Sequence, residues 1–200
     1  MHRLTIATRN RHKAREMAAL LGPDWIVEDL TGRMDLPEPE ETGGTFEENA
    51  AIKAVAASRA LRGLVLADDS GLEVDALAGH PGIRSARYAG EKATDQENRD
   101  RLLRELAGLK EAVAEPMTAR FRCAMAVAEA GHVLQIFRGQ AEGRIVLAEA
   151  GTGGFGYDPL FIPNGYSQTF AELDAGTKNR LSHRGRAMEQ AREWLRKRAG

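Results

Sequence analysis

The sequence has little cysteine and no long hydrophobic run, and both shortages narrow the class of protein. Of its 200 residues only Cys123 is a cysteine, which rules out an internal disulfide and favours a reducing compartment. Polar residues follow Met1 too soon for a signal peptide, and no apolar run is long enough to cross a bilayer. We therefore expect a cytoplasmic protein with no membrane partner.

An excess of charge of either sign is also missing. Lys and Arg number 28 against 29 Asp and Glu, a net charge of -1, so the sequence lacks the basic field of nucleic-acid-binding proteins. A polyanion would have to be held by a local cluster of cations. Hydrophobic residues make up 42% of the chain, which suffices for one large domain or two small lobes that share a sheet.

An apolar run that meets two carboxylates is the most informative stretch. Residues 64–67 are typical of a buried strand, and Asp68, Asp69, Ser70 and Gly71 follow. We expect the strand to end at the aspartates, where the Ser-Gly pair turns the chain. Paired carboxylates at such a sheet edge can hold a divalent cation or act as a base. Solvated aspartates at a strand end would give the same pattern.

Near the N-terminus, a predicted strand over 4–8 leads through a polar loop into a helix predicted over 14–21. In this order of elements, free N–H groups at a helix N-terminus can face a phosphate. The loop has no glycines of the Walker type, but it offers a hydroxyl, an amide and an ammonium at Thr8, Asn10 and Lys13. An N-cap followed by solvated basic residues would also explain the pattern.

An acidic, proline-containing loop over 36–44 precedes a second predicted helix over about 46–61. Thr45 and Glu48 have the spacing of a capping box at its start, and Lys53 lies about two turns into it. A carboxylate held at this helix entrance could reach a metal bound at Asp69.

A glycine-rich stretch over 151–161 fits the spacing G-x-G-x-x-G, but Tyr-Asp-Pro follows it instead of a helix, which excludes a dinucleotide-binding fold. Its glycines allow close backbone approach to a ligand, and Phe155 could stack on a base. A glycine-rich bulge between strands is the alternative interpretation.

The C-terminal region predicts a last helix, capped by Ser182 and running to about Lys197. His183 and Arg184 lie in its first turn, where the helix dipole disfavours cations, which suggests an anionic or carbonyl-rich partner. Other segments predict scaffold. These are a helix over 95–109, a hairpin of strands over 119–127 and 133–139, and a continuing strand pattern to 146.

In this order and at these separations, the motifs closely resemble the inosine triphosphate pyrophosphatase family, over nearly the whole chain. The matching stretches are Thr8-x-Asn10-x-x-Lys13, Glu41, 45–53, 67–72, 81–87, 151–159 and 182–185. The resemblance implies one α/β domain over residues 1–200, with an elongated, twisted mixed sheet and flanking helices forming two lobes around a central cleft. It also implies a homodimer.

The implied activity is the hydrolysis of the purine nucleoside triphosphates ITP, dITP and XTP to the monophosphate and pyrophosphate, with Mg²⁺ or Mn²⁺ as cofactor. Asp69 is implied as the general base or a metal-linked carboxylate, with Glu41 or Glu40 as its metal partner. Lys53 would act beside Asp69 and hold the triphosphate, and Ser70 would touch the substrate. The loop residues implied to hold the triphosphate are Thr8, Arg9, Asn10, Arg11, His12 and Lys13.

The base of the nucleotide is implied to stack on Phe155. The residues implied to contact the base around that ring are Gly156, Tyr157, Asp158, Lys178, His183 and Arg184. Donors aimed at O6 would favour a 6-oxo purine over adenine, because the amino group of adenine would face donors and leave them unpaired.

Two other functions stay open. One is a nucleotide pyrophosphatase with a different choice of base, and the other is a regulatory module that binds a nucleotide without turnover. The joint presence of Asp69, Glu41 and Lys53 argues against the second, since a pure binder needs no base beside its metal.

Overall fold

The protein combines a mixed β-sheet with α-helices, and the computed structural model describes residues 2–33, 35–109 and 116–199. The strands are β1 (His2–Ile6), β2 (Trp25–Asp29), β3 (Val65–Val74), β4 (Met117–Glu129), β5 (His132–Ile145) and β6 (Phe161–Pro163). The helices are α1 (Arg11–Leu21), α2 (Phe46–Ala60), α3 (Asp95–Ala107), α4 (Ala175–Leu181) and α5 (His183–Ala199). In the described part of the chain, none of these helices combines the length and the apolar character needed to cross a membrane.

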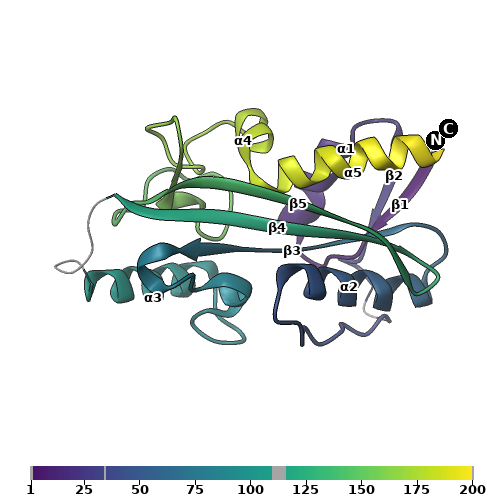
Figure 1. The fold of residues 1–200 in the computed structure, drawn as a ribbon, viewed down its shortest axis with the longest axis horizontal. Coiled ribbons are helices and arrows are strands. Elements are labelled where there is room, and N and C mark those ends of the chain that lie inside the picture. The colour runs from purple at the N-terminus through teal and green to yellow at the C-terminus, as the bar shows by residue number, and fades with distance from the viewer. Residues whose placement is uncertain (1, 34, 110–115, 200) are drawn as a thin grey trace. The chain divides into compact units, whose positions relative to one another are not determined.

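The described strands form a six-stranded sheet in the order β2-β1-β3-β4-β5-β6 (Figure 1). β1 is parallel to β2 and to β3, whereas β5 is antiparallel to β6. The register places Thr5 opposite Val65 and Ile6 opposite Leu66. This arrangement confirms the predicted α/β class with a mixed sheet.

The chain folds into two compact units. Unit 1 comprises Met1–Asp69, Cys123–Gly139 and His183–Gly200, and unit 2 comprises Ser70–Arg122 and Gln140–Ser182. Each unit has its own apolar core. The core of unit 1 includes Leu4, Ile6, Met17, Leu66, Met125, Met188 and Leu195. The core of unit 2 includes Leu72, Leu102, Leu106, Phe121, Leu160, Phe161 and Phe170. Within unit 1, α1 and α5 lie on one face of the strands and α2 on the other (Figure 1).

The starts of α2 and α3 follow the capping residues that precede them. At α3, Thr94 and Glu97 form a full capping box. At α2, the Thr45 side chain accepts the N–H of Glu48, but the Glu48 carboxylate accepts the N–H of Gly44 at 2.7 Å. The reciprocal bond of the predicted box is therefore replaced by one that holds the end of the acidic loop against α2.

The β4–β5 hairpin is confirmed, and Cys123 faces a core as its alternating pattern predicts. Cys123 is 3% exposed, and burial, together with the negative charge of Asp68, raises the pKa of its thiol to about 12. The thiol is therefore neutral near pH 8, where an exposed cysteine is partly ionised.

We expect iodoacetamide to alkylate Cys123 at pH 8 about a hundredfold more slowly in the native protein than in concentrated urea, because both access and ionisation require opening of the core. Intact-mass spectrometry against time gives both rates. Equal rates in the two solvents would contradict the buried, neutral thiol.

Candidate functional site

The two central aspartates lie inside β3 and not at its end. The strand continues through Ser70 and Gly71 to Val74, so the predicted turn at the Ser-Gly pair is wrong. β1 ends at Ile6, but β4 is the neighbour of β3 on its other side, so β3 still has a partner after its parallel neighbour has stopped. Both aspartates are buried, with Asp68 2% and Asp69 6% exposed.

The loop before α1 is folded by its own side chains. The Thr8 hydroxyl accepts the Asn10 N–H at 3.2 Å, and the Asn10 side chain accepts the N–H groups of His12 and Lys13 at 2.9 and 3.2 Å. This cap starts α1 at Arg11 and not at the predicted residue 14. The expectation of free N–H groups at this helix start is wrong for His12 and Lys13, because Asn10 already accepts both hydrogens. Lys13 can therefore meet an anion through its side-chain ammonium and not through its backbone N–H.

Lys13 reaches the first aspartate of β3. Its ammonium lies 3.1 Å from Oδ2 and 3.2 Å from Oδ1 of Asp68. From α5, the Arg184 guanidinium lies 3.2 Å from Asp68 Oδ2 and 2.7 Å from a carboxylate oxygen of Glu16. Asp68 thus sits between two cations, and the anionic partners expected for Arg184 are carboxylates of the same unit.

Lys53 reaches the second aspartate. Its ammonium lies 3.0 Å from Asp69 Oδ1 and 2.9 Å from Glu41 Oε1. Asn49, one turn earlier on α2, donates its side-chain amide to Asp69 Oδ2 at 3.3 Å. Glu40 is exposed, whereas the carboxylate of Glu41 converges with Asp69 on one cation. The arrangement favours Glu41 over Glu40 as the partner of Asp69.

The two aspartates differ in their electrostatic environment. Burial tends to raise the pKa of Asp68, but the charges of Lys13 and Arg184 outweigh it and hold that pKa well below its ordinary value. Burial dominates at Asp69 and raises the pKa of its carboxyl, although Lys53 and Lys13 oppose the shift. Asp68 is therefore a permanent anion, and Asp69 is the carboxylate with the greater tendency to take up a proton.

A divalent cation fits the Glu41–Asp69 pair, although the protein offers only part of its ligands. Among the residues that the structure describes, no three His, Cys, Asp or Glu side chains gather closely enough to hold a metal by themselves. The two carboxylates nevertheless converge on one cationic atom of Lys53. Mg²⁺ is commonly held by one or two carboxylates together with water and substrate phosphates, so this pair fits such an ion.

Arg9, which is also predicted to hold the triphosphate, contacts the acidic loop. The Arg9 guanidinium contacts Glu38 at 3.0 Å and the backbone carbonyls of Arg33 and Leu36, so it ties the acidic loop to the end of β1. Arg11 and His12 are exposed in the first turn of α1. Ser70 is half-buried, and it is the first residue of unit 2.

A second cluster lies in unit 2, around the glycine-rich stretch. Asp158 Oδ2 accepts the N–H of Phe155 at 2.8 Å and the Lys178 ammonium at 2.6 Å. That ammonium also lies 5.0 Å from the centre of the half-buried Phe155 ring. Gly154 has a φ of 72°, and a Cβ there would lie 2.1 Å from Asp158 Oδ2. The glycine is thus required for the carboxylate to reach the loop.

Of the other residues that the resemblance implies for the base, Gly156 and Tyr157 lie in unit 2 beside this cluster. His183 and Arg184 do not. Tyr157 is buried and donates its hydroxyl to the Ser85 carbonyl at 2.9 Å, and Gly156 precedes it with a φ of 60°. His183 and Arg184 are buried in the first turn of α5 and belong to unit 1. The structure therefore brings Lys178 to Phe155, and it places Arg184 against Asp68.

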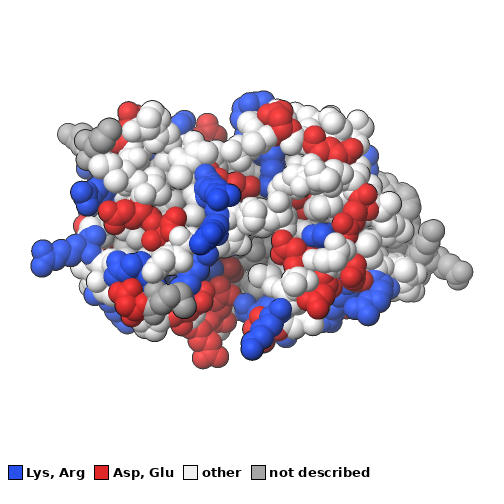
Figure 2. Space-filling model, turned by 180° about the vertical axis from the view of Figure 1, so that it is seen from behind, with Lys and Arg blue, Asp and Glu red and all other residues white. Residues whose placement is uncertain are grey.

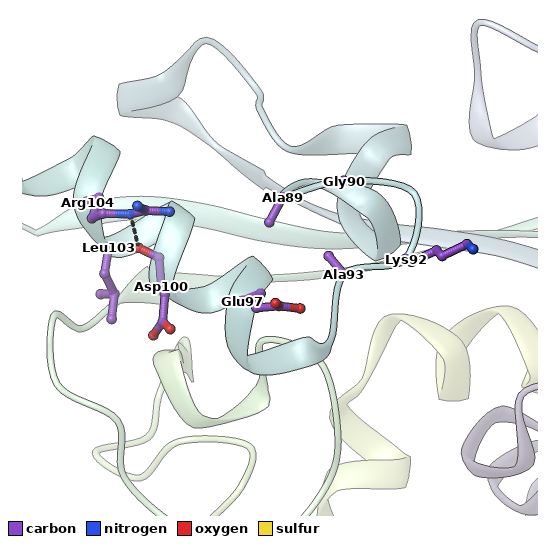
Figure 3. A pocket seen from close by; sticks show the side chains of 8 residues that line it. All are labelled: Ala89, Gly90, Lys92, Ala93, Glu97, Asp100, Leu103 and Arg104. Carbon is purple, nitrogen blue, oxygen red and sulfur yellow. Dashed lines mark hydrogen bonds between the residues drawn. The ribbon is translucent and has the colours of Figure 1, made fainter.

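Neither cluster coincides with a cavity of about 890 Å³ in unit 2. Figure 3 shows that this cavity lies between α3 and the segment that precedes it. Its lining residues are Ala89, Gly90, Lys92, Ala93, Glu97, Asp100, Leu103 and Arg104. On the face drawn in Figure 2, basic and acidic side chains are interspersed, in agreement with the balanced composition.

Sequence reasoning missed two polar residues of unit 1. Glu16 lies in the helix predicted over 14–21, and no motif there predicts its ion pair with Arg184 at 2.7 Å. Asn49 is fully buried and also accepts the N–H of Gly43 at 2.8 Å. The signal for Asn49 was available, because a polar residue one turn before Lys53 falls on the same face of the helix.

Comparison with known proteins identifies the family of this chain. A model described as the Ham1 family matches residues 4–194. A dITP/XTP pyrophosphatase of Shouchella clausii is 47% identical over 195 residues, which cover 98% of this chain and 97% of that protein. Another dITP/XTP pyrophosphatase, of Geobacillus kaustophilus, is 48% identical and matches over 96% of this chain and 94% of its own length.

Solved structures agree with the fold as well. A HAM1 protein from Coxiella burnetii has a TM-score of 0.85 and 40% identity, with 98% of this chain and all of that chain covered. The Staphylococcus aureus Ham1 protein has a TM-score of 0.84 and 37% identity, with 98% of this chain and 99% of that chain covered. The resemblance inferred from the motifs is thus confirmed, and the chain belongs to the Ham1 family.

Proposed function

We propose that this protein is a dITP/XTP pyrophosphatase, which hydrolyses non-standard purine nucleoside triphosphates to the monophosphate and pyrophosphate. The curated relatives that carry this name match nearly the whole chain. One observation in unit 1 carries the proposal. Two adjacent buried carboxylates, Asp68 and Asp69, are each met by a lysine from a different helix. A triphosphate needs such cations, and its hydrolysis needs such a base.

The reaction is a displacement by water at the α-phosphorus. The water oxygen bonds to this phosphorus, the bond to the bridging oxygen breaks, and that oxygen leaves with pyrophosphate. Asp69 takes the proton of the water, and Asn49 and Lys53 hold its carboxylate in place at 3.3 and 3.0 Å. Lys13 and Lys53 offset the negative charge of the phosphates, and the Thr8 hydroxyl can donate to a phosphate oxygen.

Glu41 and Asp69 are the residues that would hold Mg²⁺, or Mn²⁺ in its place. When bound, such an ion supplies charge neutralisation at the phosphate oxygens and lowers the pKa of water. Lys53 contacts both carboxylates and keeps them together when neither bears a metal.

The base of the nucleotide is proposed to bind the cluster of unit 2, with its ring on Phe155. The Lys178–Asp158 pair carries one donor and one acceptor, which match O6 and N1–H of a 6-oxo purine. Adenine presents the opposite pattern, with an amino donor at C6 and an acceptor at N1. Adenine would offer a donor where the pair needs an acceptor and an acceptor where it needs a donor, which favours rejection of ATP.

A panel of nucleoside triphosphates tests the proposal. With Mg²⁺ present, we expect kcat/KM for ITP, dITP and XTP to exceed that for ATP by at least about a hundredfold, measured as pyrophosphate release. GTP shares O6 and N1–H with ITP, so its rate separately measures selection at C2. Equal rates on ATP and ITP would favour the pyrophosphatase with a different base choice, and binding without pyrophosphate release would favour the regulatory module.

The remaining expectations are part of the same proposal. We propose that residues 1–200 act as a single nucleotide-pyrophosphatase domain, and that the protein works in the cytoplasm, where its free nucleotide substrates occur. The homodimer implied by the motifs also stays a prediction, which sedimentation equilibrium of the purified chain would test.

A further inference from the structure

The backbone of Gly156 is held on both sides by one helix. Its N–H donates to Asp95 Oδ2 at 2.7 Å, and its carbonyl accepts from Arg99 Nη1 at 2.7 Å. Both side chains come from the first turns of α3, within unit 2. Because they are four residues apart, they lie on one face of that helix. Gly156 directly follows Phe155, the ring on which the base is proposed to stack.

Arg99 is itself fixed in place. Its Nε donates to Glu149 at 2.9 Å, its Nη2 donates to Gln96 at 2.6 Å, and its side chain is only 12% exposed. Gln96 in turn donates to the same Glu149 oxygen at 2.8 Å. All three guanidinium nitrogens of Arg99 thus donate to an acceptor, which fixes the orientation of the group. The hydrogen bond to the Gly156 carbonyl therefore comes from a rigid donor.

The contacts to Gly156 differ from those that attach α3 to the fold. Leu102 and Leu106 of α3 are fully buried in the core of unit 2 and anchor the helix. Asp95 and Arg99 add nothing to that apolar core and instead reach the loop through charged groups, which form the stronger class of hydrogen bonds. The helix that the sequence assigns to scaffold therefore also determines where the backbone after Phe155 runs.

We propose that Asp95 and Arg99 are positioning residues that set the place of the Phe155 ring and thereby the choice of base. The proposal rests on the proposed function, and neither residue is assigned to contact the substrate. Because Asp158 holds the N–H of Phe155 and α3 holds both backbone groups of Gly156, the ring has little freedom to follow a wrong base. Loss of the α3 contacts removes one of these two restraints.

The test compares Asp95→Ala and Arg99→Lys with two controls. Asp95→Asn keeps an acceptor for the Gly156 N–H and loses only the charge. Arg104→Ala removes an arginine of the same helix whose Nε donates to the Asp100 carbonyl of that helix (Figure 3). The measurements are kcat and KM for ITP and ATP, inhibition by inorganic tripolyphosphate, and amide exchange at Gly156.

We expect Asp95→Ala and Arg99→Lys to raise KM for ITP roughly tenfold and to lower the preference for ITP over ATP by a similar factor, since small displacements of a binding group cost about this much. We expect kcat at saturating ITP and inhibition by tripolyphosphate to stay within about twofold of the wild type, because neither depends on the loop that carries Phe155 and Gly156. Exchange at Gly156 becomes faster in Asp95→Ala but not in Asp95→Asn or Arg104→Ala.

Each other outcome overturns the inference. If Asp95→Asn behaves like Asp95→Ala, the charge at the helix start matters and not the hydrogen bond. If kcat/KM falls equally for ITP and ATP and the melting temperature also falls, the two residues only support the fold. A wild-type protein that releases no pyrophosphate from ITP would reject the proposed function and the role in base choice together, and the exchange at Gly156 would then still show whether the hydrogen bond restrains the loop.

Discussion

Replacement of Asp69 by asparagine is expected to lower kcat for ITP by about a thousandfold, within the range that a positioned general base contributes. The change preserves the size of the side chain and removes its capacity to take a proton. It also removes half of the Glu41–Asp69 pair that would hold the cation. Since Asn49 keeps donating toward this position and Lys53 keeps Glu41 as a partner, the fold should survive. Pyrophosphate release at saturating ITP measures the effect.

The matched control for Asp69→Asn is Glu73→Gln on the same strand. Glu73 pairs with Arg120 and Arg122 in unit 2, at 3.7 and 3.3 Å, and has no proposed part in the chemistry. We expect its kcat to stay within about twofold of the wild type, since a partly exposed ion pair contributes little. Full turnover by Asp69→Asn, with the melting temperature unchanged, would show that the base is another group.

Replacement of Arg184 by methionine is expected to lower the free energy of unfolding by about 3 kcal/mol, because it leaves a buried carboxylate with one of its two cations missing. Asp68 is 1% exposed in its side chain, and Arg184 is 3% exposed. The remaining contact to Lys13 keeps the expected loss near the lower end for broken buried pairs. This is a large share of the stability of an ordinary domain. Urea unfolding followed by circular dichroism measures it.

Arg186→Met is the control, since Arg186 is an exposed arginine two residues further along α5. Its free energy of unfolding should match that of the wild type within about 0.5 kcal/mol. The same variants also test the role in reading the base that the motifs imply for Arg184. A stable Arg184→Met protein with a lowered preference for ITP over ATP would support that role and contradict the structural one.

Most of the fold could be predicted from local patterns. The alternation of 119–127 and 133–139 predicted the β4–β5 hairpin, and the helix predicted over 95–109 begins where α3 begins. The turn predicted at Ser70-Gly71 was wrong. The turn propensity of these residues competes with strand pairing, and β3 continues through them because β4 is its neighbour there. Helix α4 was not predicted, since a helix of seven residues is too short to show a clear apolar period.

For the candidate site, the sequence predicted the types of functional group but not which of them contact one another. Within unit 1, Lys13 contacts Asp68 and Lys53 contacts Asp69, whereas the role of these residues in binding and catalysis stays a prediction. Glu16 and Asn49 were missed because their polar atoms contribute only through partners that are distant along the chain. The N-cap was the alternative interpretation of the loop, because the Asn10 amide could face either its own helix or a ligand; the structure shows that it caps α1.

The sequence alone determined the class of fold, the main helices and strands, and the kinds of group that the site contains, because these depend on residues within a few positions of one another. Only the tertiary structure decided that Lys13 and Arg184 share Asp68 while Lys53 joins Asp69 to Glu41. Those partners lie 55, 116, 16 and 12 residues apart. Long, flexible cationic side chains can reach several carboxylates, so which pairs form depends on the folded backbone that buries them together.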